Sequence, residues 1–441
     1  MLKKRSALLF YLLLALTFAL GTLGATAQEG PTEITFWHAM SGSRAEVVDE
    51  IVNRFNEANP DVQVTAEFKG SYAETLTAAI AAYRAGEAPH IVQVYEVGTR
   101  TMLDSGAIVP VMEVSGGQLD PTIFVEPILN YYTVDDQLWC MPFNSSTAML
   151  YYNKDLFEEA GLDPEAPPTT FDELYEVGQQ LLEAGVVEEG VIAFGWPAWI
   201  FEQMFAIHNQ FIANNENGRE GLATEVYFNS EFGVDVMTEW LRWSEAGILA
   251  YGGREYQAND PFIAGEIAML IQSTSSLGGI QNNVEFDLGT AFLPYIEEYG
   301  REGNNVVGGG CLWTMAGHSE EEYSAVWRFF EFLSEDEQSI TWHQGTGYFP
   351  STKSAVDALE EVGWFEENPN FLTAFEQILS GQDTPAARGA LLGDFVTIRD
   401  IEDAAFEEVI VNGVDPEQAL TEATEAANQI LEDYASLYGE E

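Results

Sequence analysis

The fold is decided by three short runs of sequence, ITFWHAM (34–40), VQVTAEF (62–68) and HIVQVY (90–95), which are rich in aromatic and β-branched residues. Such runs predict β-strands. Residues 44–59 lie between the first two runs and carry apolar side chains at helical spacing, and residues 72–87 form an alanine-rich segment before the third. Both segments predict helices. The alternation of strand and helix predicts an α/β unit with a largely parallel sheet.

Two polar side chains directly follow predicted strands of this unit. Tyr72 comes shortly after the second run, and Glu96 is the first residue after the third. In open parallel sheets, ligands bind beyond the carboxyl ends of the strands. The sequence therefore places a candidate site near these two residues.

Outward from this unit, the middle of the chain is helix-rich with scattered strands. We expect the last segment, 416–437, to be a long amphipathic helix, because its apolar residues fall on one face. No low-complexity linker separates two halves, so we expect two lobes between which the chain crosses more than once. The other expected elements are helices at 156–160, 171–184, 234–246 and 323–333, and buried strands at 262–272 and 306–315.

The composition is strongly acidic. Among 441 residues there are 72 Asp and Glu but only 17 Lys and Arg, which gives a formal net charge of −55. The composition lacks the basic footprint of a nucleic-acid-binding protein, so we expect no nucleic-acid partner. The acids are spread along the whole chain and predict a solvated surface. Salt near 1 M reduces the Debye length to about 3 Å, so we hypothesise a saline habitat for this self-repelling surface.

The first 27 residues are typical of a secretory signal peptide. Three basic residues precede an apolar stretch from Ala7 to Gly24, and Ala25-Thr26-Ala27 has the pattern of a cleavage site. A retained membrane anchor is the alternative, since 18 apolar residues are at the lower limit for a spanning helix. We expect cleavage before Gln28 and a periplasmic or otherwise exported protein.

Two cysteines, Cys140 and Cys311, occur in the whole chain. A chain of this length with two cysteines is not a disulfide scaffold. We expect two buried thiols, with a single disulfide as the alternative.

The sequence carries no recognisable catalytic motif. The five histidines are not spaced as zinc ligands, there is no G-x-S-x-G nucleophile motif, and Gly308-Gly309-Gly310 lacks the lysine of a phosphate-binding loop. With so many acids, a carboxylate pair for glycoside hydrolysis is neither indicated nor excluded. We therefore expect a binding protein without cofactor or metal, and keep a secreted hydrolase as the alternative from another class.

A set of segments in order along the chain resembles the extracellular solute-binding proteins of ABC importers. Within this family the chain is similar to the members that bind sn-glycerol 3-phosphate. The resemblance implies an α/β fold of two lobes with hinge crossovers, the type II or maltose-binding-like architecture. The segments are FWHAM (36–40), RFNEANPDVQV (54–64), KGSY (69–72), IVQVYEVGT (91–99), PFNSST (142–147), YYNKDLFEEAGLDPE (151–165), GWPAWI (195–200), GGGCLW (308–313), WHQGTGYFPSTK (342–353) and IRDIEDAAFEEV (398–409).

By this resemblance, lobe 1 comprises residues 28–145 and 307–355, and lobe 2 comprises 146–306 and 356–441. Crossovers near Ser146 and Gly308 agree with the turn-forming residues there. Taken singly, most of the family's ligand contacts would be more typical of structural positions, and only their order along the chain marks them as a site. These residues are Tyr72, Glu96, Ser146, Trp196, Trp199, Ser273, Gly309, Tyr348 and Arg399.

The resemblance implies a role for each kind of residue. Arg399 would donate a bidentate pair of hydrogen bonds to two phosphate oxygens. The serines, Tyr348 and the Gly309 backbone N–H would be neutral donors. Glu96 would accept from glycerol hydroxyls and repel phosphate. The two tryptophans would form an apolar wall for the glycerol carbons.

The implied ligand is sn-glycerol 3-phosphate or a glycerophosphodiester, since aromatic side chains could also hold the choline of glycerophosphocholine by cation–π attraction. A sugar is the alternative ligand of the same fold. The implied partner is an ABC permease, and the chain is expected to be a monomer. The chain departs from the family pattern at Cys311 and at Leu391, where relatives often have a basic residue for which Arg388 is a candidate replacement.

Overall fold

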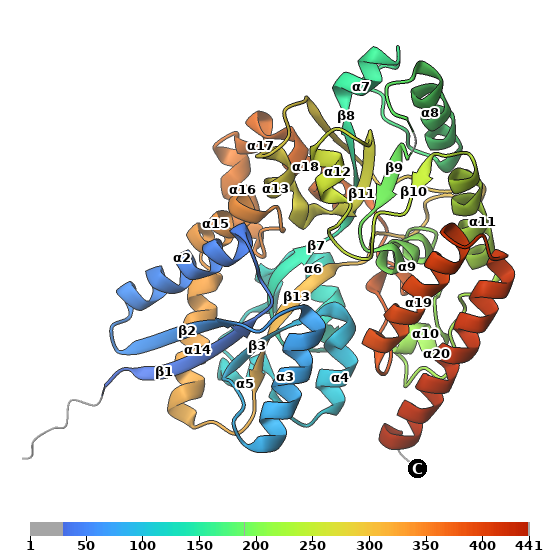
Figure 1. Cartoon of the computed structure of the whole chain (residues 1–441). Helices are drawn as coiled ribbons and strands as arrows, with labels where there is room; N and C mark the ends of the chain where they lie inside the picture. The colour runs from blue at the N-terminus through green and yellow to red at the C-terminus, as the bar shows by residue number, and fades with distance from the viewer. Residues whose placement is uncertain (1–29, 189, 440–441) are drawn as a thin grey trace, which may run out of the picture.

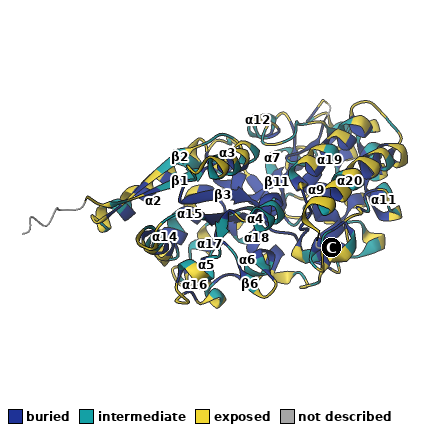
Figure 2. Ribbon diagram, turned by 90° about the horizontal axis from the view of Figure 1, so that it is seen from below, coloured by how far each residue is buried: buried dark blue, intermediate teal, exposed yellow. Residues whose placement is uncertain are grey.

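The computed structural model describes residues 30–188 and 190–439, which form two large β-sheets with helices on their faces (Figure 1) and a small hairpin of β5 Thr133–Val134 with β6 Gln137–Leu138. The predicted signal peptide, residues 1–27, lies outside the described residues. Within the described part of the chain, no helix has both the length and the apolar character needed to cross a membrane. Figure 2 shows central strands such as β3 (Ile91–Tyr95) and β11 (Met269–Ser273) buried in the interior, whereas the edge strand β2 (Val62–Phe68) is partly exposed and many exposed residues lie on the outer faces of the helices.

The first sheet contains the strands predicted at the start of the chain. Its order is β2-β1-β3-β13-β4, with β7 paired to β13. As the alternation predicted, β1 pairs in parallel with β2 and β3, whereas β13 is antiparallel to β3, β4 and β7. The strands are β1 Thr32–His38, β2 Val62–Phe68, β3 Ile91–Tyr95, β4 Ile108–Val109, β7 Met141–Ser146 and β13 Gly308–Met315.

Two predicted helices pack on this sheet. The helix α2 (Ser43–Ala58) contacts β2, and α3 (Tyr72–Ala85) contacts β1 and β3. Ser71 starts α3 with a capping box, because its side chain accepts from the backbone N–H of Glu74 while Glu74 accepts from the N–H of Ser71. This cap fixes Tyr72 as the first residue of the helix.

The second sheet has the order β10-β9-β11-β8-β12. The strands β10, β9 and β11 are parallel, while β8 runs antiparallel between β11 and β12. Aromatic side chains of Phe194, Trp240 and Trp243 fill the core beside it. The strands are β8 Ala148–Asn153, β9 Ile192–Phe194, β10 Leu249–Ala250, β11 Met269–Ser273 and β12 Leu288–Ala291.

The chain passes between the sheets through two neighbouring segments. The strand β7 ends at Ser146 in the first sheet, and β8 begins two residues later in the second. The return runs from β12 to β13, and Gly308 at the start of β13 pairs with Ser146. The two passages therefore lie side by side.

The helices agree largely with the sequence predictions. Those expected at 171–184, 323–333 and 416–437 are all present. The longer helices besides α2 and α3 are α8 Phe171–Ala184, α9 Pro197–Ile207, α11 Glu231–Glu245, α14 Glu320–Leu333, α15 Asp336–Thr346, α16 Lys353–Glu361, α18 Pro369–Ser380, α19 Phe395–Ile410 and α20 Pro416–Tyr438. Shorter ones include α4 Thr99–Asp104, α6 Glu126–Tyr132, α7 Lys154–Glu159 and α12 Asn259–Ile263.

The strand predicted over residues 262–272 is wrong in its first part. Residues Asn259–Ile263 form the short helix α12, and only Met269–Ser273 form a strand, β11. Pro261 lies in the first turn of α12, where its missing N–H costs nothing. Phe262 of this helix is buried and packs against Tyr151 and Phe286. Its apolar character is therefore compatible with a helix as well as with the predicted strand.

The expectation of two free thiols is also wrong. Cys140 and Cys311 form a disulfide, with their Cα atoms 5.9 Å apart. Cys140 directly precedes β7, and Cys311 lies in the neighbouring β13, where it pairs with Pro142. Strand pairing brings together two cysteines that are 171 residues apart in sequence.

We expect the double substitution Cys140→Ala, Cys311→Ala to lower the free energy of unfolding by about 2–4 kcal/mol, because the unfolded chain loses a covalent constraint. Urea unfolding followed by circular dichroism measures the change. As a control, reductant should destabilise the wild-type protein and leave the double variant unaffected. Equal urea midpoints for oxidised wild type and double variant would contradict the prediction.

Candidate ligand-binding site

All nine residues that the sequence analysis selected line one cavity between the two sheets. Tyr95, Tyr256 and Ser275 complete its lining, and its volume is about 30 Å³. We call it the inner cavity. It adjoins an outer groove of about 350 Å³, with which it shares Tyr72, Tyr95, Trp196, Tyr256 and Arg399.

Both sheets and their helices supply the lining of the inner cavity. From the side of the first sheet, Glu96 follows β3 and Ser146 ends β7. From the side of the second sheet, Trp199 lies on α9, Ser273 ends β11 and Arg399 lies on α19. The strand ends at which sequence analysis placed the site are therefore where the cavity is found.

Arg399 is the centre of a buried ionic cluster. Its Nε and Nη2 donate to the two carboxylate oxygens of Glu202 at 2.7 and 2.6 Å, and its Nη1 donates to Glu96 at 2.6 Å. All three residues are buried. The bidentate edge of the guanidinium is thus occupied by Glu202, and two of its five N–H groups remain for a ligand.

The two carboxylates determine the electrostatics of the inner cavity. Burial opposes the charge of Arg399, but Glu202 and Glu96 outweigh it and raise the pKa of the guanidinium. Burial raises the pKa of Glu96, and Arg399 offsets part of that effect. One cation between two carboxylates gives no net positive charge at this end of the cavity.

Two further acids of α19 lie beside this cluster. Burial raises the pKa of Glu402 well above its usual range, and the nearby Glu202 raises it further, which favours the protonated carboxyl. Burial also raises the pKa of Asp403 to about 7, although its Oδ1 accepts a hydrogen bond of 3.0 Å from the backbone N–H of Ala198. The cluster therefore contains one acid, Asp403, with a pKa near neutral pH, and a second, Glu402, that burial holds toward its protonated form.

Aromatic rings form the walls of the inner cavity. The rings of Tyr72 and Tyr95 stack with centroids 5.0 Å apart, and Trp196 meets Tyr256 edge-on at 5.4 Å. The hydroxyls of Tyr72 and Tyr348 lie 3.2 Å apart. These side chains offer flat apolar faces together with phenol groups that hydrogen bond.

Hydrogen-bond donors are also present at the cavity. The indole N–H of Trp199 has no hydrogen-bond partner among the described residues, although the side chain is buried. The hydroxyls of Ser273 and Ser275 lie 2.9 Å apart. A buried unpaired donor is costly unless a ligand or water satisfies it. The serine hydroxyls, which line the cavity, can hydrogen bond with a polar ligand.

Gly309 is required by its backbone conformation. Its φ is +88°, and a Cβ at this position would lie 1.8 Å from the carbonyl oxygen of Asn144 in the paired strand β7. Only glycine combines this φ with so close an approach of the two strands. Its place on the cavity wall thus follows from the pairing of β7 with β13.

Sequence reasoning missed several residues of the site. Glu202 lies one turn after Trp199 on α9, so its helical spacing from a selected residue was an available signal. Tyr95 directly precedes Glu96, so its position at the end of the same strand was also an available signal. Tyr256 and Ser275 lie in or beside loops of the second half, and no local pattern marks them.

Arg388, which the sequence analysis offered as a replacement for the basic residue of relatives at Leu391, does not line the cavity. Leu391 is buried, and Arg388 pairs with Asp383 at 3.0 Å on another groove, which includes residues of α6. Neither lines the inner cavity or the outer groove. Arg388 therefore does not supply the missing positive charge there.

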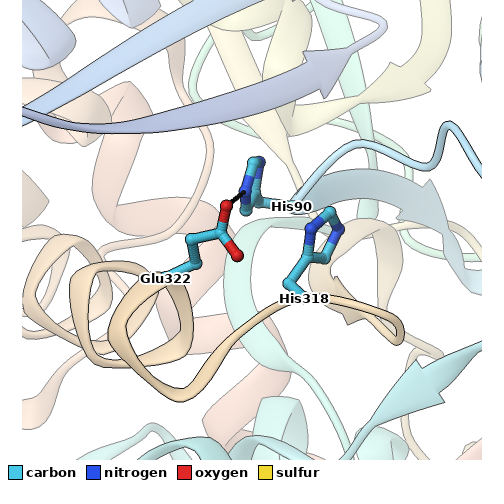
Figure 3. Close-up of side chains that lie close together, drawn as sticks. All are labelled: His90, His318 and Glu322. Carbon is cyan, nitrogen blue, oxygen red and sulfur yellow. Dashed lines mark ion pairs between the residues drawn. The ribbon is translucent and has the colours of Figure 1, made fainter.

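A second cluster of polar side chains, His90, His318 and Glu322, lies outside the cavity (Figure 3). The imidazole rings stack with centroids 3.9 Å apart, and His90 Nε2 lies 3.4 Å from Glu322. Because His90 Nδ1 accepts from the backbone N–H of Thr35, its proton resides on Nε2 and faces the carboxylate. The Nδ1 atom of His90 is thus already engaged by the backbone, and the cluster consists of two stacked imidazoles beside a carboxylate.

The pKa values of this cluster agree with that description. Burial lowers the pKa of His90, and the neighbouring His318 lowers it further. Backbone hydrogen bonding at Ser319 lowers the pKa of Glu322 to about 2. The imidazole of His90 is thus neutral and Glu322 is charged at neutral pH.

Comparison with known proteins places this architecture in a family. Residues 50–373 match the bacterial extracellular solute-binding protein family. The chain is 38% identical over 430 residues to the sn-glycerol-3-phosphate-binding periplasmic protein UgpB of Escherichia coli K12, covering 96% of this chain and 97% of that protein. The Salmonella typhimurium protein of the same name is 39% identical over 407 residues, which is 91% of this chain and 92% of that protein.

Solved structures show the same fold. UgpB from Mycobacterium tuberculosis in complex with glycerophosphocholine superposes with a TM-score of 0.79 at 23% identity, covering 92% of this chain and 99% of that one. Maltose-bound MalE3 of T. maritima gives a TM-score of 0.75 at 18% identity, over 90% of this chain and 99% of that one. The fold is thus that of the two-lobe, maltose-binding-like proteins, and the chain belongs to the bacterial extracellular solute-binding protein family.

Proposed function

We propose that this chain is the periplasmic receptor of an ABC importer and binds sn-glycerol 3-phosphate or a glycerophosphodiester such as glycerophosphocholine. The observation that carries the proposal is the gathering of all nine selected residues around one cavity between the sheets. Relatives that are 38–39% identical over nearly the whole chain are named for binding sn-glycerol 3-phosphate. The receptor delivers its ligand unchanged to the permease and acts as a monomer after removal of its signal peptide.

The polar groups of the inner cavity support a direction for the ligand. Glu96 accepts from hydroxyl groups and repels phosphate, so the glycerol end lies toward Glu96 and Arg399. Ser146, Ser273, Tyr348 and the backbone at Gly309 are neutral groups on the cavity wall that suit the phosphate. The aromatic walls pack against the glycerol carbons or, in glycerophosphocholine, hold the quaternary ammonium by cation–π attraction.

The lobes in this proposal follow the two sheets. Lobe 1 comprises residues 28–145 and 307–355, and lobe 2 comprises 146–306 and 356–441. The one-residue interval between β7 and β8 and the neighbouring return before β13 support hinges at these points. Because the inner cavity has walls from both sheets, rotation about the hinges would open it to admit the ligand.

Titration calorimetry with sn-glycerol 3-phosphate, glycerophosphocholine and maltose tests the proposal. We expect saturable 1:1 binding of at least one of the two phosphorylated compounds, and recovery of that compound unchanged after prolonged incubation, as judged by phosphorus NMR. Binding of maltose alone would replace the proposal with a sugar receptor of the same fold, which the aromatic walls also suit. Cleavage of the compound would instead indicate a hydrolase.

A further inference from the structure

The outer groove contains three arginines, Arg44, Arg254 and Arg399, in a chain that is otherwise poor in basic residues. Arg399 is neutralised by Glu96 and Glu202, as described above. Arg254 is neutralised by Glu407, to which its Nε and Nη2 donate at 2.7 and 2.6 Å. Two of the three guanidinium groups are therefore already bound to carboxylates.

Arg44 differs from the other two arginines of the groove. No carboxylate of the described residues forms an ion pair with it, and it makes no hydrogen bond to a side chain of α2 or α3. It lies in the first turn of α2 and is half-buried at the groove wall. Among the three arginines of the groove, Arg44 alone has no carboxylate partner in the part of the chain that the structure describes.

Tyrosines surround the guanidinium of Arg44. Its Cζ lies 4.4 Å from the centre of the Tyr256 ring, so the charged group is stacked on an aromatic face. Burial opposes its charge, but the phenol oxygens of Tyr256, Tyr348 and Tyr72 outweigh this and raise its pKa. The arginine is therefore fully charged. Since these tyrosines also line the inner cavity, it lies close to where the ligand is proposed to bind.

We propose that Arg44 supplies the cation of this receptor's anion subsite and approaches the phosphate or phosphodiester group from the outer groove, while the neutral groups of the inner cavity, Tyr348 among them, contact the same phosphate from the cavity wall. The inference rests on the proposed function, because it assumes a phosphorylated ligand. A planar guanidinium held on an aromatic ring presents its N–H edge to phosphate oxygens in a fixed orientation. The positive end of the α2 dipole adds a smaller attraction in the same place.

The acids of the groove support the same placement. Glu255, Asp400 and Asp403 line the groove on segments that follow β10 or belong to α19, on the side of Arg254. Asp400, and also Glu255 and Asp403 when their carboxyls are ionised, repel a phosphate from that wall. In the inner cavity, Glu96 repels it from the Arg399 end, and Glu202, which binds Arg399 from outside the cavity lining, cancels the remaining positive charge there. The Arg44 side is thus where the electrostatic field favours an anion.

The test compares Arg44→Gln and Arg44→Lys with wild type in titration calorimetry against sn-glycerol 3-phosphate and glycerophosphocholine. We expect Arg44→Gln to weaken binding of sn-glycerol 3-phosphate about 10- to 100-fold, as loss of a charge-assisted hydrogen bond predicts. Glycerophosphocholine, whose phosphate carries one negative charge, should lose less. Arg44→Lys should retain part of the affinity, because lysine keeps the positive charge but cannot donate the bidentate hydrogen bonds of a guanidinium.

The matched control is Arg54→Gln, which removes the same charge from the same helix outside the groove, where Arg54 pairs with Glu50. Thermal unfolding of each variant shows that the fold is retained. Wild-type affinity in Arg44→Gln, or equal losses in Arg44→Gln and Arg54→Gln, would overturn the anion subsite while the proposed function stands. Failure of the wild-type protein to bind either phosphorylated compound would overturn both.

Discussion

Replacing Arg399 with methionine should lower the free energy of unfolding by about 3–5 kcal/mol at neutral pH, because it leaves the carboxylates of Glu96 and Glu202 buried without their shared cation. The three hydrogen bonds that hold the cluster are 2.6–2.7 Å long and connect residues far apart in sequence. Urea unfolding followed by tryptophan fluorescence measures the loss. The same variant should also lose ligand affinity, since two N–H groups of the guanidinium are left for the ligand.

The effect on folding can be separated from the effect on binding. The triple variant Arg399→Met, Glu96→Gln, Glu202→Gln removes the two uncompensated charges and should recover much of the lost stability, because neutral replacements of buried ion clusters are tolerated. It should not recover ligand affinity. A single variant Arg399→Met as stable as wild type would show that the cluster does not stabilise the fold.

Asp403→Asn should stabilise the protein by about 4 kcal/mol at pH 8. The asparagine Oδ1 can keep the hydrogen bond from the Ala198 N–H, and the substitution removes a carboxylate that burial disfavours. The pKa of Asp403 rises from 3.8 in an unperturbed carboxyl to about 7 in the folded protein. At about 1.4 kcal/mol for each pH unit, that difference accounts for the expected gain.

The pH dependence of this gain has a defined sign. Between the two pKa values the folded protein binds more protons than the unfolded chain, so the contribution of Asp403 to stability falls as the pH rises through this window. The advantage of Asp403→Asn should therefore shrink to about 2 kcal/mol at pH 5 and vanish in stronger acid. Urea midpoints at pH 5, 6.5 and 8 measure it.

Asp400→Asn is the matched control for this experiment. Asp400 lies three residues earlier on the same helix, with 72% of its side chain exposed. Its surface ion pair with Arg254, at 3.9 Å, contributes at most about 1 kcal/mol, so the control should change stability little and without the pH dependence expected of Asp403→Asn. A gain for Asp403→Asn that is independent of pH would contradict the assignment of the effect to a buried carboxylate.

Much of the fold could be predicted from local sequence. The first three strands and the helices between them follow from apolar periodicity and were predicted within a few residues. The apolar run at 262–272 was misassigned in part, because a buried helix and a buried strand share the same composition over so short a length. Pro261 was the available signal for a helix start in that segment.

The contacts within the site were less accessible. The ion pair between Glu96 and Arg399 joins residues 303 positions apart, and no local pattern encodes it. The same holds for the stacking of Arg44 on Tyr256. Resemblance selected nine residues that the fold brings to one cavity. It gave no sign that the guanidinium expected to hold phosphate is already engaged by two carboxylates.

The bond between Cys140 and Cys311 has a consequence for limited proteolysis. All five strands of the second sheet, from residue 148 to residue 291, lie between the two bonded cysteines. A protease that nicks any loop between them leaves two fragments that remain covalently attached. On a denaturing gel without reductant, such a nicked product would therefore run as one species. It would separate into two fragments after a thiol is added.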